Sequence, residues 1–251
     1  MPEQQTILIL GGTGEARTLA DKLVETYPKA RVITSLAGRT SSPRLPGGEI
    51  REGGFGGADG LATYLIDENV DLMIDATHPY AAQISAHAAD AVRQTGVPLL
   101  ALVRAPWSEQ PGDRWIRVPD MAAAVQEISR KSDVCLITTG VKDLEVFAPI
   151  VTTKLFVRLI EQPAGTLPLP DAEVVIGKPP YKLDEERALM QLLGIDLMVT
   201  KNAGGDGTRS KIDAARDLGI EVIMIDRPAM PDVETVGTVD AALTWIAGKL
   251  A

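Results

Sequence analysis

A glycine-rich turn is the first candidate for chemistry, in the segment 8–17, LILGGTGEAR. Glycines at such a turn let the backbone approach a pyrophosphate, whose charge is stabilised by the exposed N–H groups at a helix start. The usual dinucleotide fingerprint is G-x-G-x-x-G, but here Arg17 replaces the third glycine. We expect Arg17 to face a cofactor phosphate or a substrate carboxylate; an ordinary glycine-rich turn is the alternative. The expected cofactor-binding residues are Gly11, Gly12, Thr13, Gly14 and Glu15.

The loop SLAGRT, residues 35–40, follows the second apolar run and bears on the choice of cofactor. NAD sites usually place an Asp or Glu here, to accept hydrogen bonds from the ribose 2′-hydroxyl. This loop instead offers Ser35 and Arg39, with Gly38 beside them. A hydroxyl and a guanidinium can hold a 2′-phosphate through charge-assisted hydrogen bonds. The loop therefore predicts NADPH/NADP+, and a solvated surface Arg39 is the alternative.

The loop ATHPYA, residues 76–81, offers a histidine and a tyrosine directly after another apolar run. At the carboxyl end of a strand, His78 and Tyr80 can position a nicotinamide ring or donate a proton. We expect Thr77 and Pro79 to flank the same ring. The alternative is that His78 only caps or packs.

A second glycine loop, TKNAGGDGTRSK at residues 200–211, combines cations with a backbone suited to anions. Lys201 can bind a carboxylate or supply a proton. It is our first candidate for a proton-related role, followed by Tyr80 and His78. The alternative is an ordinary loop with solvated lysines. Outside this loop, Arg158 in the segment KLFVRLIEQP is either an edge-strand residue or a substrate contact. The expected substrate-binding residues are Arg17, Thr139, Gly140, Arg158, Lys201, Asn202, Gly205 and Lys211.

The segment 47–60, GGEIREGGFGGADG, has seven glycines in fourteen residues. Such density permits close backbone approach to a flat ligand, or a mobile flap. A plain linker is the alternative interpretation.

Short apolar runs that alternate with helical patterns must position these loops. Near-continuous apolar runs are typical of parallel strands covered on both faces. The pattern predicts an α/β fold with mostly parallel, doubly wound sheets. The predicted strands are residues 6–10, 31–35, 71–75, 98–103, 134–138, 196–200 and 221–225.

The chain repeats itself in order. Residues 69–81 align with 194–206, and residues 93–104 align with 216–227. A strand and an Ala-rich helix follow each copy, at 116–128 and 234–246. We predict two Rossmann-like halves, 1–130 for NADPH and 131–251 for substrate-binding loops. Because ligands bind beyond the carboxyl ends of parallel strands, we expect a cleft between the halves.

Composition excludes several classes of function. A net charge of −9 argues against nucleic-acid binding. One cysteine and two histidines cannot form a dense His/Cys metal cluster, so we expect no metal. The chain has no apolar run of membrane-spanning length and no export signal at its start. We therefore expect a cytoplasmic protein, without nucleic-acid or membrane partners, and a monomer.

Taken together, the motifs resemble the precorrin-6A reductase family of cobalamin biosynthesis. The matching segments run in order through nearly the whole chain: ILGGTGEAR, SLAGRT, GGFGG-x-x-GL-x-x-YL, DATHPYA, TTG, KPPY and TKNAGG-x-G-x-x-x-K. The family usually has Phe where Tyr80 stands. The resemblance implies an NADPH-dependent oxidoreductase that reduces one double bond of the tetrapyrrole precorrin-6A to give precorrin-6B.

Three alternatives remain open at this stage. A cobalt-dependent branch with similar motifs acts on cobalt-precorrin-6A. Another kind of NADPH-dependent reductase is possible, although no tyrosine has the Lys four residues on that short-chain dehydrogenases need. A non-catalytic NADP(H)-binding sensor would need the first half only, so Lys201 and the second glycine loop would be dispensable.

Overall fold

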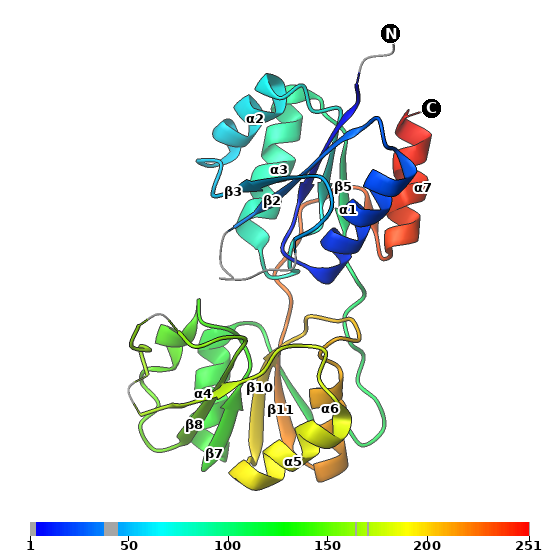
Figure 1. The fold of residues 1–251 in the computed structure, drawn as a ribbon. Helices are drawn as coiled ribbons and strands as arrows, with labels where there is room; N and C mark the ends of the chain where they lie inside the picture. Colours follow the sequence, from blue (N-terminus) through cyan, green and yellow to red (C-terminus); the bar gives the residue numbers. More distant parts are fainter. Residues whose placement is uncertain (1–3, 38–44, 164, 170, 251) are drawn as a thin grey trace. The chain divides into compact units, whose positions relative to one another are not determined.

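The computed structural model describes residues 4–37, 45–163, 165–169 and 171–250, which form two compact units (Figure 1). Unit one comprises residues 1–105 and 228–251, and unit two comprises residues 106–227. Each unit is built on a six-stranded sheet whose pairings are all parallel in the described residues. The predicted α/β class with two Rossmann-like halves is confirmed.

The sheet of unit one has the order β12-β5-β4-β1-β2-β3. Its central strand is an apolar run whose residues are all buried, as a parallel strand covered on both faces requires. The strands are β1 (Thr6–Leu10), β2 (Arg31–Leu36), β3 (Glu49–Glu52), β4 (Leu72–Asp75), β5 (Leu99–Leu102) and β12 (Thr235–Val236).

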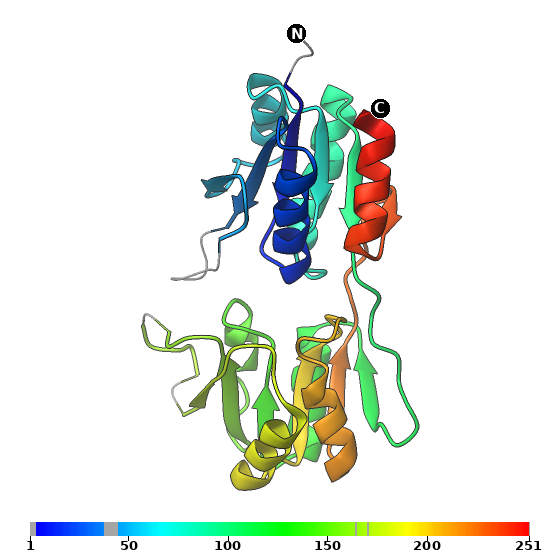
Figure 2. The same ribbon diagram turned by 45° about the vertical axis from the view of Figure 1, so that its right-hand side comes forward.

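Helices cover both faces of this sheet (Figures 1 and 2). Ile7 and Ile9 pack with α1 (Gly14–Thr26) and α7 (Val239–Leu250), while Leu8 and Leu10 pack toward α2 (Ala58–Asp67) and α3 (Ala82–Thr95). This division follows from the strand geometry, because successive side chains point to opposite faces. The apolar run of β1 thus supplies two cores at once.

Unit two has the corresponding order β6-β11-β10-β7-β8-β9. Equivalent positions in the two sheets are taken by strands of the same repeat, with β7 in the place of β1 and β10 in the place of β4. The strands are β6 (Trp115–Val118), β7 (Val134–Ile137), β8 (Lys154–Leu159), β9 (Glu173–Ile176), β10 (Leu197–Lys201) and β11 (Glu221–Ile225).

The helices of unit two correspond to those of unit one except after β7. Met190 of α5 (Leu183–Leu193) and Ile212 of α6 (Ser210–Leu218) join one core with Phe156 and Met198 of the sheet. The other face carries α4 (Met121–Lys131) and the short 3₁₀ helix η1 (Leu144–Phe147). Unit two therefore has only a single 3₁₀ turn at the place where unit one has α1.

The boundary between the units differs from the predicted division at residue 130. β6 pairs with β11 in unit two, and β12 pairs with β5 in unit one, so each repeat supplies the last strand of the other sheet. Residues 106–130 accordingly belong to unit two and residues 228–251 to unit one. Both segments have the same strand-and-helix pattern, and their local sequence therefore does not show which sheet each completes.

Candidate functional site

The glycine turn of unit one forms the start of α1, as expected. Thr13 caps the helix, since its Oγ1 accepts a hydrogen bond from the Ala16 N–H at 3.1 Å and donates to Ala76 O at 2.7 Å. A Cβ on Gly11 would lie 2.8 Å from Thr34 Cγ2, and Gly12 has a φ of 111°. Both positions therefore need glycine, and the first N–H groups of α1 point to the carboxyl edge of the sheet.

Two charged side chains flank this turn. The Oε2 atom of Glu15 lies 2.9 Å from Nη1 of Arg104, which follows β5. Arg17 stands near the turn, because a Cβ on Gly14 would be 4.0 Å from its Nη2 atom. Arg104 offsets the negative charge of Glu15, and Arg17 adds a positive charge over the helix start. The edge is therefore suited to an anion.

The carboxyl end of β2 places Ser35 in a buried position beside β3. Nη1 of Arg51, on β3, donates to Ser35 Oγ at 3.3 Å. Gly38 and Arg39, expected to bind the 2′-phosphate, lie outside the described residues. Arg51 is therefore a described cation in contact with Ser35, where we expect the 2′-phosphate.

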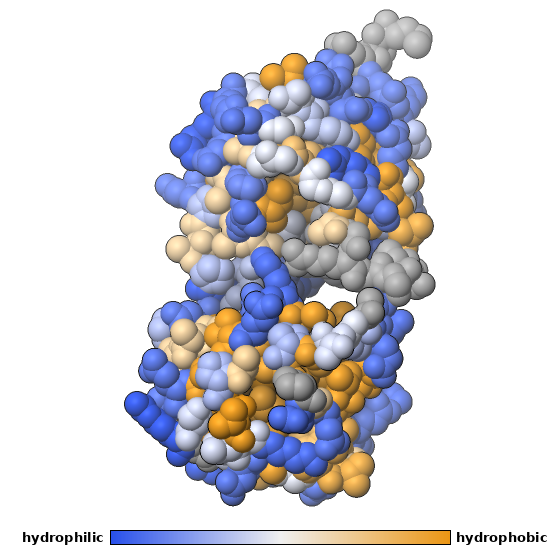
Figure 3. Space-filling view, turned by 90° about the vertical axis from the view of Figure 1, so that its left-hand side faces the viewer, coloured by the Kyte–Doolittle hydropathy of each residue, from blue (hydrophilic) through white to orange (hydrophobic). Residues whose placement is uncertain are grey.

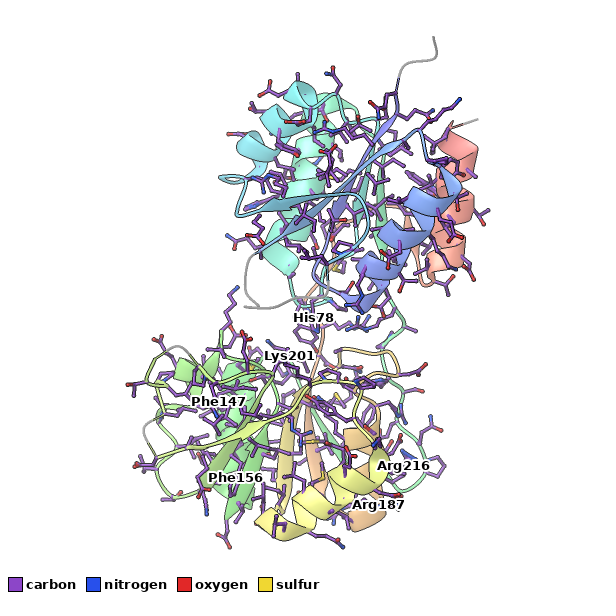
Figure 4. All side chains as sticks on the ribbon, viewed as in Figure 1. His78, Phe147, Phe156, Arg187, Lys201 and Arg216 are labelled. Atoms are coloured by element: carbon purple, nitrogen blue, oxygen red, sulfur yellow. The ribbon has the colours of Figure 1, made fainter. Side chains whose placement is uncertain are left out.

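The loop after β4 is organised by a buried carboxylate. Asp75 accepts hydrogen bonds from the N–H and the hydroxyl of Thr77, at 3.1 and 2.7 Å. The N–H of Tyr80 donates to Nδ1 of His78 at 3.3 Å, and their ring centroids are 5.7 Å apart. Figure 4 shows His78 just beyond the strands of unit one. Thr77, His78 and Tyr80 are thus brought together with Pro79 on one turn, as expected.

Lys201, the last residue of β10, has two fixed partners in unit two. Its Nζ donates to Asp143 Oδ2 at 2.9 Å and to Thr139 O at 3.0 Å. Gly140, with a φ of 85°, makes the turn between these partners possible. Figure 4 shows Lys201 at the end of its sheet, where ligands of open α/β sheets bind.

Asn202 and Gly205 are hydrogen-bonded to Trp107. The Asn202 side chain accepts from the Trp107 N–H at 2.8 Å and donates to the Trp107 carbonyl at 3.0 Å. The indole N–H of Trp107 donates to Gly205 O at 2.8 Å. Both residues therefore hold the second glycine loop against the segment after residue 105. Their predicted contact with substrate stays a prediction.

Arg158 lies in β8 and is paired inside unit two. Its Nη1 is 2.6 Å from both carboxylate oxygens of Glu186, and the two side chains are only 7% and 3% exposed. Its Cζ lies 4.7 Å from the ring centroid of Tyr181, whose hydroxyl donates to Gly177 O. A cavity of about 290 Å³ adjoins Arg158, Tyr181 and Glu186. Because β8 lies between β7 and β9, Arg158 is not an edge-strand residue, and its predicted contact with substrate stays a prediction.

Lys211 is buried on α6. Its Nζ donates to Thr138 Oγ1 at 3.0 Å and lies 5.7 Å from the Trp107 ring centroid. Burial, with the nearby positive charge of Arg158, lowers the pKa of the Lys211 ammonium group to about 7, while Glu186 opposes the change. Lys211 thus titrates in the range where an enzyme can exchange a proton.

Apolar side chains are exposed on the same unit. Figure 3 shows hydrophobic surface on the side of unit two that carries η1 and β8. Val141, which is 52% exposed, directly follows Gly140 at the carboxyl end of β7. Other exposed aliphatic residues of this unit are Val146, Val151, Ile160, Ile176 and, on α5, Leu192. Unit two therefore combines cations with apolar contact surface.

Sequence reasoning missed several partners of these residues. Asp75 had a signal, because an Asp two residues before Thr77 is typical of a local side-chain turn. Arg104 also had one, since it recurs as Arg227 in the repeat. Asp143 and Glu186 had none, because their partners lie 58 and 28 residues away in the chain.

The described residues also bear on metal ions and membranes as ligands. No group of three or more His, Cys, Asp or Glu side chains there is arranged to hold a metal ion. None of the described helices combines the length and the apolar character needed to cross a membrane.

Comparison with known proteins gives a consistent result over the whole chain. The model of the family "Precorrin-6x reductase CbiJ/CobK" matches residues 6–247. A precorrin-6A reductase of Rhodococcus erythropolis is 44% identical over 241 residues, covering 96% of each chain. One of Sinorhizobium is 45% identical over 249 residues, covering 99% of this chain and 95% of the relative.

A more distant relative and a solved structure extend this comparison. A cobalt-precorrin-6A reductase of Priestia megaterium is 28% identical over 237 residues, covering 88% of this chain and 90% of the relative. The solved structure of CobK precorrin-6A reductase is 42% identical, with a TM-score of 0.91 and coverage of 99% of this chain and 98% of that one.

Proposed function

Because the chain belongs to the precorrin-6x reductase family, we propose that it reduces one double bond of precorrin-6A with NADPH and forms precorrin-6B. The relatives at 44% and 45% identity have the name precorrin-6A reductase, whereas the cobalt-precorrin-6A reductase is 28% identical. We therefore favour the cobalt-free macrocycle as the substrate. When bound, NADPH supplies a hydride, and the neighbouring ring carbon then takes a proton.

The observation that carries the proposal is the cradle at the start of α1. Gly11 allows β1 and β2 to approach closely, and Gly12 leaves open space at a backbone conformation that other residues avoid. The N–H groups at the start of α1 and the Arg17 guanidinium fit the pyrophosphate. Thr13 holds the turn to Ala76, so that it is fixed relative to the nicotinamide loop.

We assign the nicotinamide end to the loop after β4. Asp75 orients Thr77, and Pro79 is buried, so the loop is rigid beneath the exposed His78 ring. Glu15 is paired with Arg104, which keeps its carboxylate from repelling the cofactor phosphates. This assignment explains why an acidic residue can stand inside an anion-binding turn.

We assign the macrocycle to unit two. Precorrin-6A carries several acetate and propionate carboxylates. We expect these carboxylates to contact Lys201, Lys211 and Arg158. Lys201 is held in place by its ion pair with Asp143, so it can contact a carboxylate or deliver a proton to the reduced ring. Tyr80 and His78 are the next candidates for the proton. Exposed Val141 suits the apolar face of a flat ring.

Stopped-flow absorbance with precorrin-6A tests the reaction. We expect the macrocycle spectrum to change with NADPH and to change much more slowly with NADH. No spectral change with NADPH would exclude the proposed function, and equal rates with both cofactors would exclude the preference for the 2′-phosphate. The cobalt form of the substrate, measured in parallel, should react more slowly.

A substitution tests the division of roles. Lys201→Ala should lower turnover while NADPH binding, measured by fluorescence, persists. Lys142→Ala, which removes an exposed lysine of the same unit, is the matched control and should leave both unchanged. If Lys201→Ala abolishes NADPH binding instead, the assignment of cofactor and substrate to different units is wrong.

A further inference from the structure

Arg51 on β3 lies beside the strand end at which a dinucleotide ribose is expected. Arg51 and Ser35 are partners in the parallel register of β3 and β2, so their side chains share one face of the sheet. Glu52 is the next residue along the strand, and its carboxylate therefore belongs to the opposite face. The face with Ser35 thus presents a cation where an NAD site presents an acid.

The guanidinium of Arg51 is held rigidly. Its Nη1 donates to Gly53 O at 2.6 Å and its Nη2 to Gly54 O at 2.8 Å, in addition to the bond to Ser35. Its Cζ lies 3.7 Å from the ring centroid of Phe55, as in a cation–π stack. A side chain fixed in this way loses little further conformational entropy when it binds a ligand.

Part of the guanidinium has hydrogen-bonding capacity left. Three of its five N–H groups are used in the bonds to Ser35, Gly53 and Gly54. Within the described part of the chain, the structure gives no partner to Nε–H or to the second hydrogen on Nη2. Two parallel N–H groups on one guanidinium match the oxygens of a phosphate.

The surface beside this cation is open. Gly53, Gly56 and Gly57 have φ values of 98°, 82° and 99°, and among the described residues a Cβ added to any of them would meet nothing within 4 Å. The same is true of the space beside Gly54. This is the segment whose glycine density indicated close backbone approach to a flat ligand. The structure thus joins a fixed cation, a hydroxyl and an open glycine surface.

We propose that Arg51, together with Ser35, recognises the 2′-phosphate of NADPH and so determines the preference for NADPH over NADH. This inference rests on the proposed function, and it adds a specificity residue on a strand that the sequence did not predict. In the competing interpretation, Arg51 only holds the glycine loop in place. The two interpretations differ in whether the effect of Arg51 depends on the 2′-phosphate.

Calorimetric titration of the full chain with 2′,5′-ADP (adenosine 2′,5′-bisphosphate) and with 5′-AMP separates them. The two ligands differ only in the phosphate that Arg51 would contact. For the unaltered chain we expect clearly tighter binding of 2′,5′-ADP. For Arg51→Met we expect the affinity for 2′,5′-ADP to fall roughly 10- to 100-fold, the usual range for a hydrogen-bonded charged group. The affinity for 5′-AMP should stay within about twofold.

Further variants keep the test informative if Arg51→Met disturbs folding. Arg51→Lys keeps the charge but loses the planar fork, and we expect it to restore part of the affinity for 2′,5′-ADP. Ser35→Ala removes only the hydroxyl and should cause a smaller loss that is again specific for 2′,5′-ADP. Arg93→Met removes an exposed arginine paired with Asp90 on α3, and as the matched control it should change neither affinity.

Each contrary result has a distinct meaning. If the unaltered chain binds both ligands equally, the proposed NADPH preference fails, and the role of Arg51 fails with it. If the unaltered chain discriminates and Arg51→Met discriminates equally well, only the role of Arg51 is overturned. Equal losses for both ligands in Arg51→Met and Arg51→Lys would overturn it too, because the residue would then act on the loop and not on the phosphate.

Discussion

After β1, unit one continues into the 13-residue helix α1, whereas after the corresponding strand β7 unit two continues through residues 138–143 into the four-residue η1. The strand orders of the two sheets correspond, and so do the carboxyl edges at which ligands bind. Only unit one keeps the long helix whose start can hold a pyrophosphate. In unit two the corresponding edge is occupied by lysines with protein partners, Lys201 and Lys211. This difference between the two edges is why we assign the cofactor to unit one and the macrocycle to unit two.

The charged residues of the two units differ in the same sense. Arg104 and Arg227 occupy matching places in the repeat. Arg104 pairs with the side chain of Glu15 at a ligand edge, while Arg227 donates to the backbone carbonyls of Asn202 and Ala203. One copy adjusts the charge of a binding turn, and the other holds a loop. Four variants can test this contrast.

The largest effect is expected in unit two, from Glu186→Gln. The substitution leaves the buried Arg158 without its counter-charge, which should lower the free energy of unfolding by about 3–5 kcal/mol. Urea unfolding followed by circular dichroism measures the change. Glu185→Gln, whose exposed carboxylate pairs with Lys182, is the control and should cost under about 1 kcal/mol. Similar losses of unfolding free energy in both variants would show that the buried pair contributes no more to stability than an exposed one.

Lys211 should give unit two a pH dependence of stability. The pKa is about 7 in the folded chain and near the usual lysine value of about 10.4 when unfolded. Between these values the unfolded chain binds more protons, so the free energy of unfolding should rise with pH, by up to about 1.4 kcal/mol per unit. Below about pH 7 this contribution no longer changes.

Lys211→Met should remove that slope. Urea unfolding of both proteins at pH 7, 8 and 9 measures it as the difference between them, which cancels the other titrating groups. Lys142→Met, at an exposed position, should keep the slope of the unaltered chain. An unchanged slope in Lys211→Met would mean that the ammonium group remains charged in the folded protein.

Gly11 directly follows β1, and Thr138 directly follows the corresponding strand β7, so Gly11→Thr introduces into unit one the residue that unit two has at this place. The new side chain would meet Thr34, Leu36 and the Ser35 carbonyl within 3.3 Å, so we expect a cost of about 1–3 kcal/mol in unfolding free energy. NADPH binding, measured by fluorescence titration, should weaken as β1 and β2 move apart. Gly248→Ala, in an open position on α7, should leave it unchanged. Normal NADPH affinity in Gly11→Thr would argue against the close approach.

The smallest effect is expected from Arg104→Met. Because both partners are partly exposed, stability should change by less than about 1 kcal/mol. The uncompensated Glu15 should nevertheless weaken NADPH binding, roughly threefold by calorimetry for a loss of about 0.6 kcal/mol. The double variant Arg104→Met/Glu15→Gln should recover it, and failure to recover would show that Arg104 does more than offset Glu15.

The sequence by itself determined the apolar strands and the helix starts. The run 6–10 is apolar after Thr6, and this alone predicts a strand buried on both faces, as the structure has it. Thr13 caps α1 through a hydrogen bond to a residue only three positions away. Such signals are local, so they can be interpreted without the fold. The places of the glycine turn, the His78 loop and Lys201 could be predicted from these local signals, because each lies at or just after the end of a predicted strand.

Only the tertiary structure decided which strand completes which sheet and which charges meet. β3 and β9 were not predicted, since they are short edge strands with charged residues at exposed positions. The exchange of β6 and β12 depends on backbone hydrogen bonds that their side-chain patterns do not specify. Arg51 beside Ser35 and Glu186 beside Arg158 likewise depend on contacts between separate segments, because a charge reveals its partner only when folding brings the two together.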